Sequence, residues 1–243
     1  EAFRKYVPEL KKEHNIDVVV VNGENIAGGR GISRKTLDEI YRAGADIVTS
    51  GNHIWDQKEI VSFIDDEPFL IRPANYPEGA PGKGYCIYPF KAKNIGVINV
   101  SGRTFMPPMD CPFQKVDEIL KEIKNQCDII LVDIHAEATS EKIAMGFYLD
   151  GKVTCVVGTH THVQTADNRI LPKGTAYISD LGMVGPYNSS LGINVNNAID
   201  KFITCRPVRF EMAEGPNIFS AVVLELAEDN SVKSFERILF NEE

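Results

Sequence analysis

The amino-acid sequence predicts an α/β protein that folds as a single domain over residues 1–243. Short apolar runs rich in β-branched residues alternate with amphipathic segments, the pattern of buried parallel strands joined by helices. Hydrophobic residues make up 43% of the chain and charged residues 25%, the balance of an ordinary folded protein. Polar side chains gather where these runs end. No internal repeat or low-complexity linker divides the chain, so one domain is expected.

The elements of the first two thirds follow from apolar spacing and from capping residues. Ser33 is suited to cap a helix at its start, and Gly44 is suited to end the same helix. Proline and glycine are frequent in residues 68–84, which favours an ordered loop. We expect strands at residues 17–22, 46–50, 84–89, 95–100, 128–133 and 153–157, and helices at residues 1–15, 34–43, 56–64, 113–125 and 140–149.

The two ends of the chain differ from this alternating middle. After residue 170 the segments are shorter and more antiparallel, so mixed sheets are expected, with strands at 176–179, 208–212, 219–226 and 232–240. At the start, the helix at 1–15 leads directly into a buried strand. A helix in that place is normally the second half of a β-α-β unit. We therefore expect the first strand of the domain to precede Glu1.

Charge and composition limit the partners of this protein. With 26 Lys and Arg against 34 Asp and Glu, the net charge is −8, which argues against binding long nucleic acids but allows a small phosphate ester. No apolar run approaches the roughly 18–20 residues that cross a bilayer, and we expect no signal peptide. The scattered cysteines predict buried thiols without disulfides or a thiolate zinc site, in a reducing cytoplasm. They are Cys86, Cys111, Cys127, Cys155 and Cys205.

Four of the five histidines follow the ends of predicted strands. Carboxyl ends of parallel strands share one edge of a sheet, where ligands of α/β proteins bind. Carboxylate, amide and imidazole groups together suit a first-row transition metal better than Mg²⁺ or Ca²⁺ alone. Such groups would be costly if they were buried at four strand ends without a partner. The candidate metal ligands are Glu24, Asn25, Asn52, His135, His160 and His162.

The spacing of His160 and His162 predicts two adjacent metal ions. Residues two apart in an extended chain face the same side, so each imidazole could serve one ion. Two metals roughly 3.5–4 Å apart share a bridging ligand, and Glu24 is the only acid at the first strand end. A hydroxide held between the cations would attack phosphorus, because the cations lower its pKa. His53, beside Asn52, is placed to protonate the leaving alkoxide.

Several short sequences resemble those of the calcineurin-like metallophosphoesterases. NGEN at 22–25, GNH at 51–53, the isolated His135 and GTHTH at 158–162 are similar to the ordered signature of that superfamily. The chain resembles the YmdB-like branch more closely, and this likeness spans nearly all of it. The sequences that carry it are NIAGG at 25–29, LIRPANYP at 70–77, DIHAEATS at 133–140 and THVQTAD at 161–167.

The resemblance implies a four-layer αββα sandwich, two transition-metal ions (iron, manganese or both) and phosphodiesterase activity on 2′,3′-cyclic nucleotides. It also implies that Glu24 bridges both ions and that His53 is the proton donor. By the same resemblance, one ion is completed by Asn52, His135 and His160, and the other is held by Asn25 and His162.

Two features depart from the pattern of the resembled superfamily. Its first metal ligand is an Asp in a Gly-Asp-x-x-Gly turn after the first strand, a segment that this sequence does not contain. An acidic residue usually follows its Gly-Asn-His sequence, whereas Ile54 stands here. Asp56 is the nearest acid that could orient His53.

Other interpretations of the same residues stay open. A phosphomonoesterase or protein phosphatase would use the same centre, and a weakly active regulatory scaffold that senses nucleotides would keep the fold. Arg72 and Arg103 are predicted to hold the substrate phosphate, with surface ion pairs as the alternative. Asp133 and Glu137 flank His135 and are predicted to fix its ring. The loop at 105–109 is either a wall for a base or a contact within a homo-oligomer.

Overall fold

A six-stranded mixed sheet forms one central layer of the computed structural model, which describes residues 1–242. Its four middle strands are parallel, and one antiparallel strand lies at each edge. The register places Ser101, His135 and Thr159 side by side, so three strands end at one edge of the sheet. The order across the sheet is β3 (Tyr85–Phe90), β4 (Lys93–Ser101), β5 (Ile129–His135), β6 (Cys155–Thr159), β8 (Ala176–Ile178) and β7 (Arg169–Ile170).

Two smaller sheets form the second central layer. One is the parallel pair β1 and β2, in which Asn22 lies opposite Thr49 at the carboxyl ends. The other is antiparallel and consists of three strands. The strands of this layer are β1 (Val20–Asn22), β2 (Ile47–Thr49), β9 (Gly185–Pro186), β10 (Asn217–Leu226) and β11 (Val232–Asn241).

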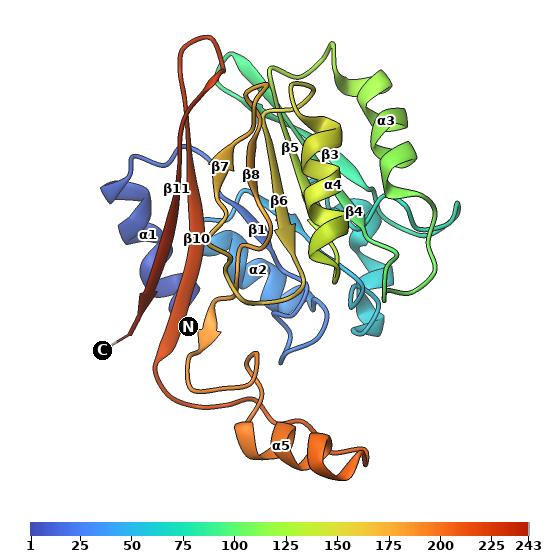
Figure 1. The fold of residues 1–243 in the computed structure, drawn as a ribbon, viewed down its shortest axis with the longest axis vertical. Helices are drawn as coiled ribbons and strands as arrows, with labels where there is room; N and C mark the ends of the chain where they lie inside the picture. Colours follow the sequence, from blue (N-terminus) through green and yellow to red (C-terminus); the bar gives the residue numbers. More distant parts are fainter. Residues whose placement is uncertain (243) are drawn as a thin grey trace.

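Helices cover the outer faces of both central layers (Figure 1). α3 (Pro112–Ile123) and α4 (Thr139–Leu149) pack on the six-stranded sheet through one apolar core. α1 (Ala2–Glu13) and α2 (Arg34–Arg42) contribute to a second core with β1 and β2. Two further apolar clusters join the two sheet layers. The predicted four-layer αββα sandwich is therefore confirmed. α5 (Val195–Thr204) lies apart from the layers on a projecting arm.

The boundaries of α2 agree with the capping residues in the sequence. The Ser33 hydroxyl accepts a hydrogen bond from the Thr36 N–H at 3.2 Å, and the Thr36 hydroxyl accepts from the Ser33 N–H. This reciprocal arrangement satisfies backbone donors at the helix start. At the other end Gly44 has φ +106°, and its N–H donates to the Tyr41 carbonyl. Such a left-handed residue normally ends a helix.

Two predicted elements are wrong. Residues 56–64 do not form an α-helix but two 3₁₀ helices, η1 (Lys58–Ser62) and η2 (Ile64–Asp66). Ile60 and Phe63 are both buried, and residues three apart share a face in the tighter 3₁₀ geometry. Residues 208–212 alternate like a strand, yet only Met212 forms a β-bridge, with Ile193.

The cysteines carry no disulfide in the described part of the chain. Cys86 and Cys155 are buried as predicted, but Cys205 is exposed, which corrects the prediction of a buried thiol there. Burial raises the pKa of both buried thiols. Among residues 1–242, no helix has the length and apolar character needed to cross a membrane.

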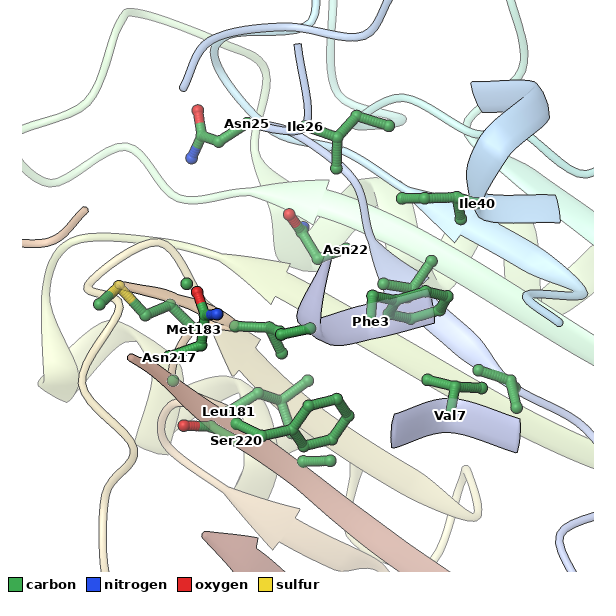
Figure 2. Close-up of a pocket in the computed structure, with 18 of the residues that line it drawn as sticks. Phe3, Val7, Asn22, Asn25, Ile26, Ile40, Leu181, Met183, Asn217 and Ser220 are labelled. Atoms are coloured by element: carbon green, nitrogen blue, oxygen red, sulfur yellow. The ribbon is translucent and has the colours of Figure 1, made fainter. Parts of the chain in front are cut away.

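A groove runs between α1, β1 and β10 (Figure 2). Phe3 and Val7 of α1 lie on it, and its lining extends to Asn25 and His162 at the strand ends. Within residues 1–242, β1 has a strand partner on one edge only, and β10 pairs with β9 over two residues. The strand expected before Glu1 lies outside this chain and stays a prediction.

The interface between the sheet layers should dominate stability. Ile47 is fully buried there, so Ile47→Ala is expected to lower the free energy of unfolding by about 2–5 kcal/mol. Leu239 on β11 is 50% exposed, so Leu239→Ala should change the free energy of unfolding by less than about 0.5 kcal/mol. Urea denaturation of both variants measures the difference. Equal losses would contradict the layered core.

Candidate metal centre

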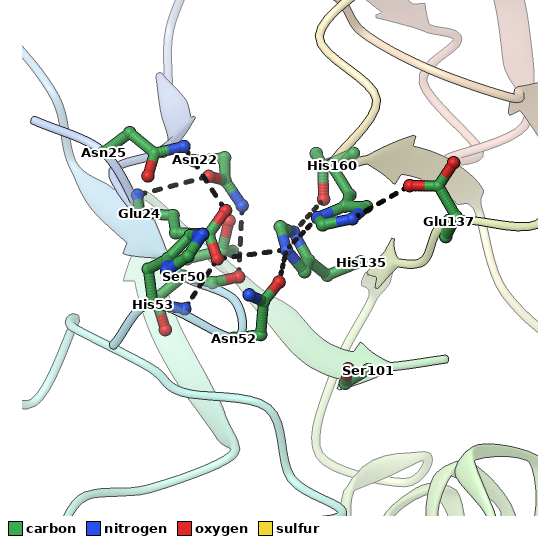
Figure 3. A network of polar contacts seen from close by, with 12 residues as sticks. Asn22, Glu24, Asn25, Ser50, Asn52, His53, Ser101, His135, Glu137 and His160 are labelled. Atoms are coloured by element: carbon green, nitrogen blue, oxygen red, sulfur yellow. Dashed lines mark hydrogen bonds and ion pairs between the residues drawn. The ribbon is translucent and has the colours of Figure 1, made fainter. Parts of the chain in front are cut away.

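The candidate site lies where strands from both central layers end (Figure 3). His135 is the last residue of β5, and His160 follows the last residue of β6. Glu24 lies two residues after β1, and Asn52 lies three residues after β2. Parallel pairing within each sheet brings these ends to one edge, so four strands deliver side chains to one place.

The centre of the site is the Nε2 atom of His135. Three polar atoms surround it: Asn52 Oδ1 at 3.0 Å, Glu24 Oε1 at 3.1 Å and His160 Nδ1 at 3.1 Å. Ligand atoms of Glu24, His135 and His160 all lie within 4.8 Å of one another, a spacing that could hold a metal ion. A ring nitrogen carries at most one hydrogen, so it cannot donate to all three neighbours.

Polar contacts on the far sides of the two rings favour the tautomers in which each histidine can bind a metal ion. The Thr159 hydroxyl donates to Asp133 at 2.7 Å and can therefore accept from His135 Nδ1–H at 2.9 Å. Nε2 of His135 then keeps its lone pair. His160 Nε2 lies 3.1 Å from a Glu137 carboxylate oxygen, an ion-pair contact that favours the tautomer with its hydrogen on Nε2 and a lone pair on Nδ1. Both free nitrogens face the same point, as in a cation site.

Asp133 is the fully buried anchor of this arrangement. Its carboxylate accepts hydrogen bonds from Asn22, Thr49 and Thr159. Burial raises its pKa, and His135 together with these three donors opposes the rise by favouring the ionised form. Asp133 fixes the His135 ring as predicted, because the Thr159 hydroxyl joins the two.

A second group of ligand atoms lies beside the first. Asn25 Nδ2 lies 3.2 Å from His162 Nε2 and 3.5 Å from Glu24 Oε2. Asn25 Oδ1 and His162 Nδ1 are buried and have no hydrogen-bond partner within the described residues. Glu24 therefore has one oxygen toward each group. These buried, unsatisfied atoms and the nitrogen and oxygen ligands around them fit a site for a cation.

Charges in the site match what a metal requires. Burial would raise the pKa of Glu24, but His135 and the His53 N–H, 2.8 Å away, outweigh it and lower the pKa to about 2. Burial lowers the pKa of His160 to about 4 and also lowers that of His162. Near neutral pH the carboxylate is charged and these imidazoles are neutral, the forms that bind metal ions.

His53 lies beside this cluster and outside it. Its Nδ1 is 3.0 Å from Asp56 Oδ2, so Asp56 orients the ring as expected. This contact leaves Nε2 of His53 as the ring atom that can exchange a proton. Arg30 Nη1 lies 3.8 Å from the same Asp56 oxygen. Its neighbours therefore hold the ring in place and leave Nε2 toward open space or a bound molecule.

Gly51 leaves the space in which the cluster closes. A Cβ atom at this position would lie 2.2 Å from His135 Nε2 and 2.5 Å from Glu24 Oε1. Non-bonded atoms do not approach so closely, so no other residue fits without displacing both side chains.

The backbone that carries His160 and His162 is not extended. Their φ angles are +96° and +66°, so the predicted alternation is wrong, although both rings reach the site. Thr161 between them donates two hydrogen bonds to Asp180 Oδ2, from its N–H at 3.0 Å and its hydroxyl at 2.6 Å. Asp180 in turn pairs with Lys142 at 2.7 Å, and both side chains are almost fully buried. This pair anchors the strained loop.

Sequence reasoning missed the Lys142–Asp180 pair. A signal existed, because Lys142 lies three and seven residues before Met145 and Leu149, on the buried face of α4. A lysine at such a position needs an acidic partner.

The remaining predicted residues differ from expectation. Glu137 contacts His160 and not His135, which corrects its predicted role. Arg72 is buried, and its guanidinium donates to the backbone carbonyls of Pro73, Ala80 and Pro81 at 2.8–2.9 Å. Arg72 therefore holds its own loop, which corrects its assignment to the substrate. Arg103 is exposed, and its role stays a prediction.

Four layers, with polar side chains where the parallel strands of the two central layers end, define the metallophosphoesterase fold class. Comparison with known families agrees. The chain belongs to the family described as YmdB-like protein, which matches residues 1–238.

Individual relatives are similar over most of their length. The chain is 52% identical to the 2′,3′-cyclic-nucleotide 2′-phosphodiesterase of Bacillus subtilis (strain 168), covering 100% of this chain and 92% of the relative. It superposes on the crystal structure of a hypothetical protein from Thermus thermophilus with a TM-score of 0.94 and 40% identity, covering 100% and 94% of the two chains. A novel phosphatase from Mycoplasma pneumoniae gives a TM-score of 0.93 and 34% identity, covering 98% and 87%.

The Lys142–Asp180 pair generates a stability prediction. Lys142→Met leaves Asp180 buried without a counter-charge and should lower the free energy of unfolding by about 3–5 kcal/mol. In an Asp180→Asn background, Lys142→Met should lower the free energy of unfolding less. The difference between the two effects, the coupling energy of the pair, should be at least about 1 kcal/mol. Urea denaturation of the four proteins measures the cycle. Additive losses would show that the two side chains act independently.

Proposed function

We propose that this protein is a binuclear metal-dependent phosphodiesterase that hydrolyses small nucleotides, with 2′,3′-cyclic nucleotides as the substrate class. One observation carries the proposal. Glu24 Oε1, Asn52 Oδ1, His135 Nε2 and His160 Nδ1 converge with their lone pairs. Four acceptors without a shared hydrogen repel one another unless a cation lies among them.

The donor sets assign residues to two ions. Asn52, His135 and His160 would hold one ion, and Asn25 and His162 the other. Glu24 supports a bridging role because its two oxygens lie toward the two groups. Nitrogen and oxygen donors without a thiolate suit iron or manganese. Such ions supply activated water near neutral pH and neutralise charge on the phosphoryl oxygens.

The protein's own groups complete the reaction. His53, oriented by Asp56, is placed to give a proton to the leaving alkoxide. For a 2′,3′-cyclic nucleotide, the opened ester oxygen stays on the ribose and becomes a hydroxyl. The substrate class is supported by the Bacillus subtilis relative, whose name states this activity.

A phosphomonoesterase is the second candidate, because the similar Mycoplasma pneumoniae structure is described as a phosphatase. The substrates of a phosphodiesterase and of a phosphomonoesterase differ in the number of ester bonds on the phosphate that is cleaved. A phosphodiesterase should cleave bis-p-nitrophenyl phosphate better than p-nitrophenyl phosphate. The reverse preference would favour the phosphomonoesterase.

Metal removal and reloading test the proposed centre. Protein stripped by a chelator should lose turnover of 2′,3′-cyclic AMP and regain it with Mn²⁺ or Fe²⁺, because the cations supply the nucleophile. Metal analysis of the reloaded protein should approach two ions per chain. Protein that binds no metal and stays inactive after loading would exclude the proposal.

Replacing His53 separates proton transfer from metal binding. His53→Gln should lower kcat for 2′,3′-cyclic AMP by about 10²–10⁴-fold and leave the metal content unchanged, because His53 lies outside the cluster. His14 is exposed at the end of α1, so His14→Gln is the matched control and should keep full activity. Loss of metal from the His53 variant would assign His53 to the ligands instead.

A further inference from the structure

A second cleft lies between the loop at residues 28–30 and the projecting arm, residues 187–216. Figure 1 shows this arm, which carries α5, below the sheets. We refer to this second cleft as the arm cleft. One wall is the glycine-rich loop that follows Asn25, and the other is the C-terminal end of α5 with the chain after it. Its lining residues are Gly28, Gly29, Arg30, Ile193, Lys201, Cys205, Arg206, Pro207, Val208, Phe210, Glu211 and Met212.

The arm cleft is joined to the candidate metal centre by short contacts. The Gly29 N–H donates to the Asn25 carbonyl at 3.1 Å, so the loop turns directly beside a proposed ligand. On another side, Arg30 lies 3.8 Å from Asp56, the carboxylate that orients His53. A molecule that places its phosphate at the metal centre therefore has this cleft next to it.

The shape of the cleft is set by backbone geometry. Gly29 has φ +92°, and a Cβ atom there would lie 2.7 Å from the Met212 sulfur. Met212 is held in place by its β-bridge to Ile193. Gly28 has φ +67° and no atom within 4 Å of an added Cβ, so the loop surface is open at that point. The arm therefore packs tightly at one position and leaves room beside it.

Three basic side chains gather at the cleft on a protein of net charge −8. The side chains of Arg30 and Arg206 are 61% and 72% exposed, and each has one distant ion-pair partner, Asp56 at 3.8 Å and Asp200 at 4.0 Å. The Lys201 ammonium lies over the Phe210 ring at 4.7 Å. Glu211 is the one acid in its described lining. Exposed guanidinium and ammonium groups suit a phosphate attached to a nucleoside.

We propose that the arm cleft binds a second phosphate of the substrate, on the 5′ side of the nucleoside whose 2′,3′-cyclic phosphate is cleaved. The proposal rests on the proposed function and narrows its substrate class to nucleotides with a further phosphate. A 2′,3′-cyclic nucleotide without a 5′-phosphate carries its single negative charge at the metal centre. It leaves Lys201 and Arg206 without a substrate anion to bind.

Kinetics on paired substrates test the proposal. The wild-type protein should have a KM for adenosine 2′,3′-cyclic phosphate 5′-phosphate about tenfold lower than for 2′,3′-cyclic AMP. The double variant Lys201→Gln/Arg206→Gln should lose this preference and keep its kcat for bis-p-nitrophenyl phosphate. Arg42→Gln, an exposed charge on α2, is the matched control and should keep the preference. Equal KM values in the wild type, or a preference that survives in the double variant, would overturn the proposal.

Binding without turnover separates this inference from the proposed function. Metal-free wild-type protein should bind 5′-AMP more tightly than adenosine, and added salt should reduce the difference because the contact is ionic. The double variant should bind 5′-AMP about tenfold more weakly than the wild type. If 5′-AMP and adenosine bind equally to the wild type, the cleft has no phosphate site, whatever reaction the metal centre performs.

Discussion

The convergence of four acceptor atoms at His135 is the interaction on which the rest of the structure depends. Lone pairs of one carboxylate, one amide and two imidazoles meet at 3.0–3.1 Å. Without a cation this contact is repulsive, so the surrounding protein must hold it together. Asp133 and Asp180 do so, because one fixes a ring through Thr159 and the other fixes the loop of His160 and His162. The stability of the fold thus supports a locally unfavourable site, a common property of functional centres.

The two-layer arrangement of sheets explains why the site forms where it does. Its side chains come from both central layers, and each sheet contributes only strand ends. Neither sheet could assemble the cluster alone, since Glu24 and Asn52 follow β1 and β2 whereas His135 and His160 follow β5 and β6. Apolar contacts between the layers set the distance across the site. Packing far from the cluster therefore controls its geometry.

Much of the fold and of the candidate metal centre could be predicted from local sequence. Apolar runs mark the buried strands, and the residues after each run lie at the edge of the sheet where the parallel strands end. That reasoning found the strands and the side chains that converge at the site, whereas the four layers were expected from the resemblance to the metallophosphoesterases. It failed where distant residues decide the conformation. The left-handed backbone at His160 depends on Asp180, which lies on another segment, and the predicted strand at 208–212 finds no partner strand. Lys142 was recognisable only as an anomaly on an apolar helix face, since its partner is not adjacent in sequence.

The space left by Gly51 has a consequence for engineering this protein. A single methyl group there would push apart the imidazole and carboxylate that define the centre. Mutagenesis libraries that aim to alter selectivity should therefore leave codon 51 unchanged and diversify the arm, where side chains are exposed and the layered core is untouched. The molecule thus keeps its candidate metal centre in the layered core and its proposed contacts with the rest of the substrate on the arm.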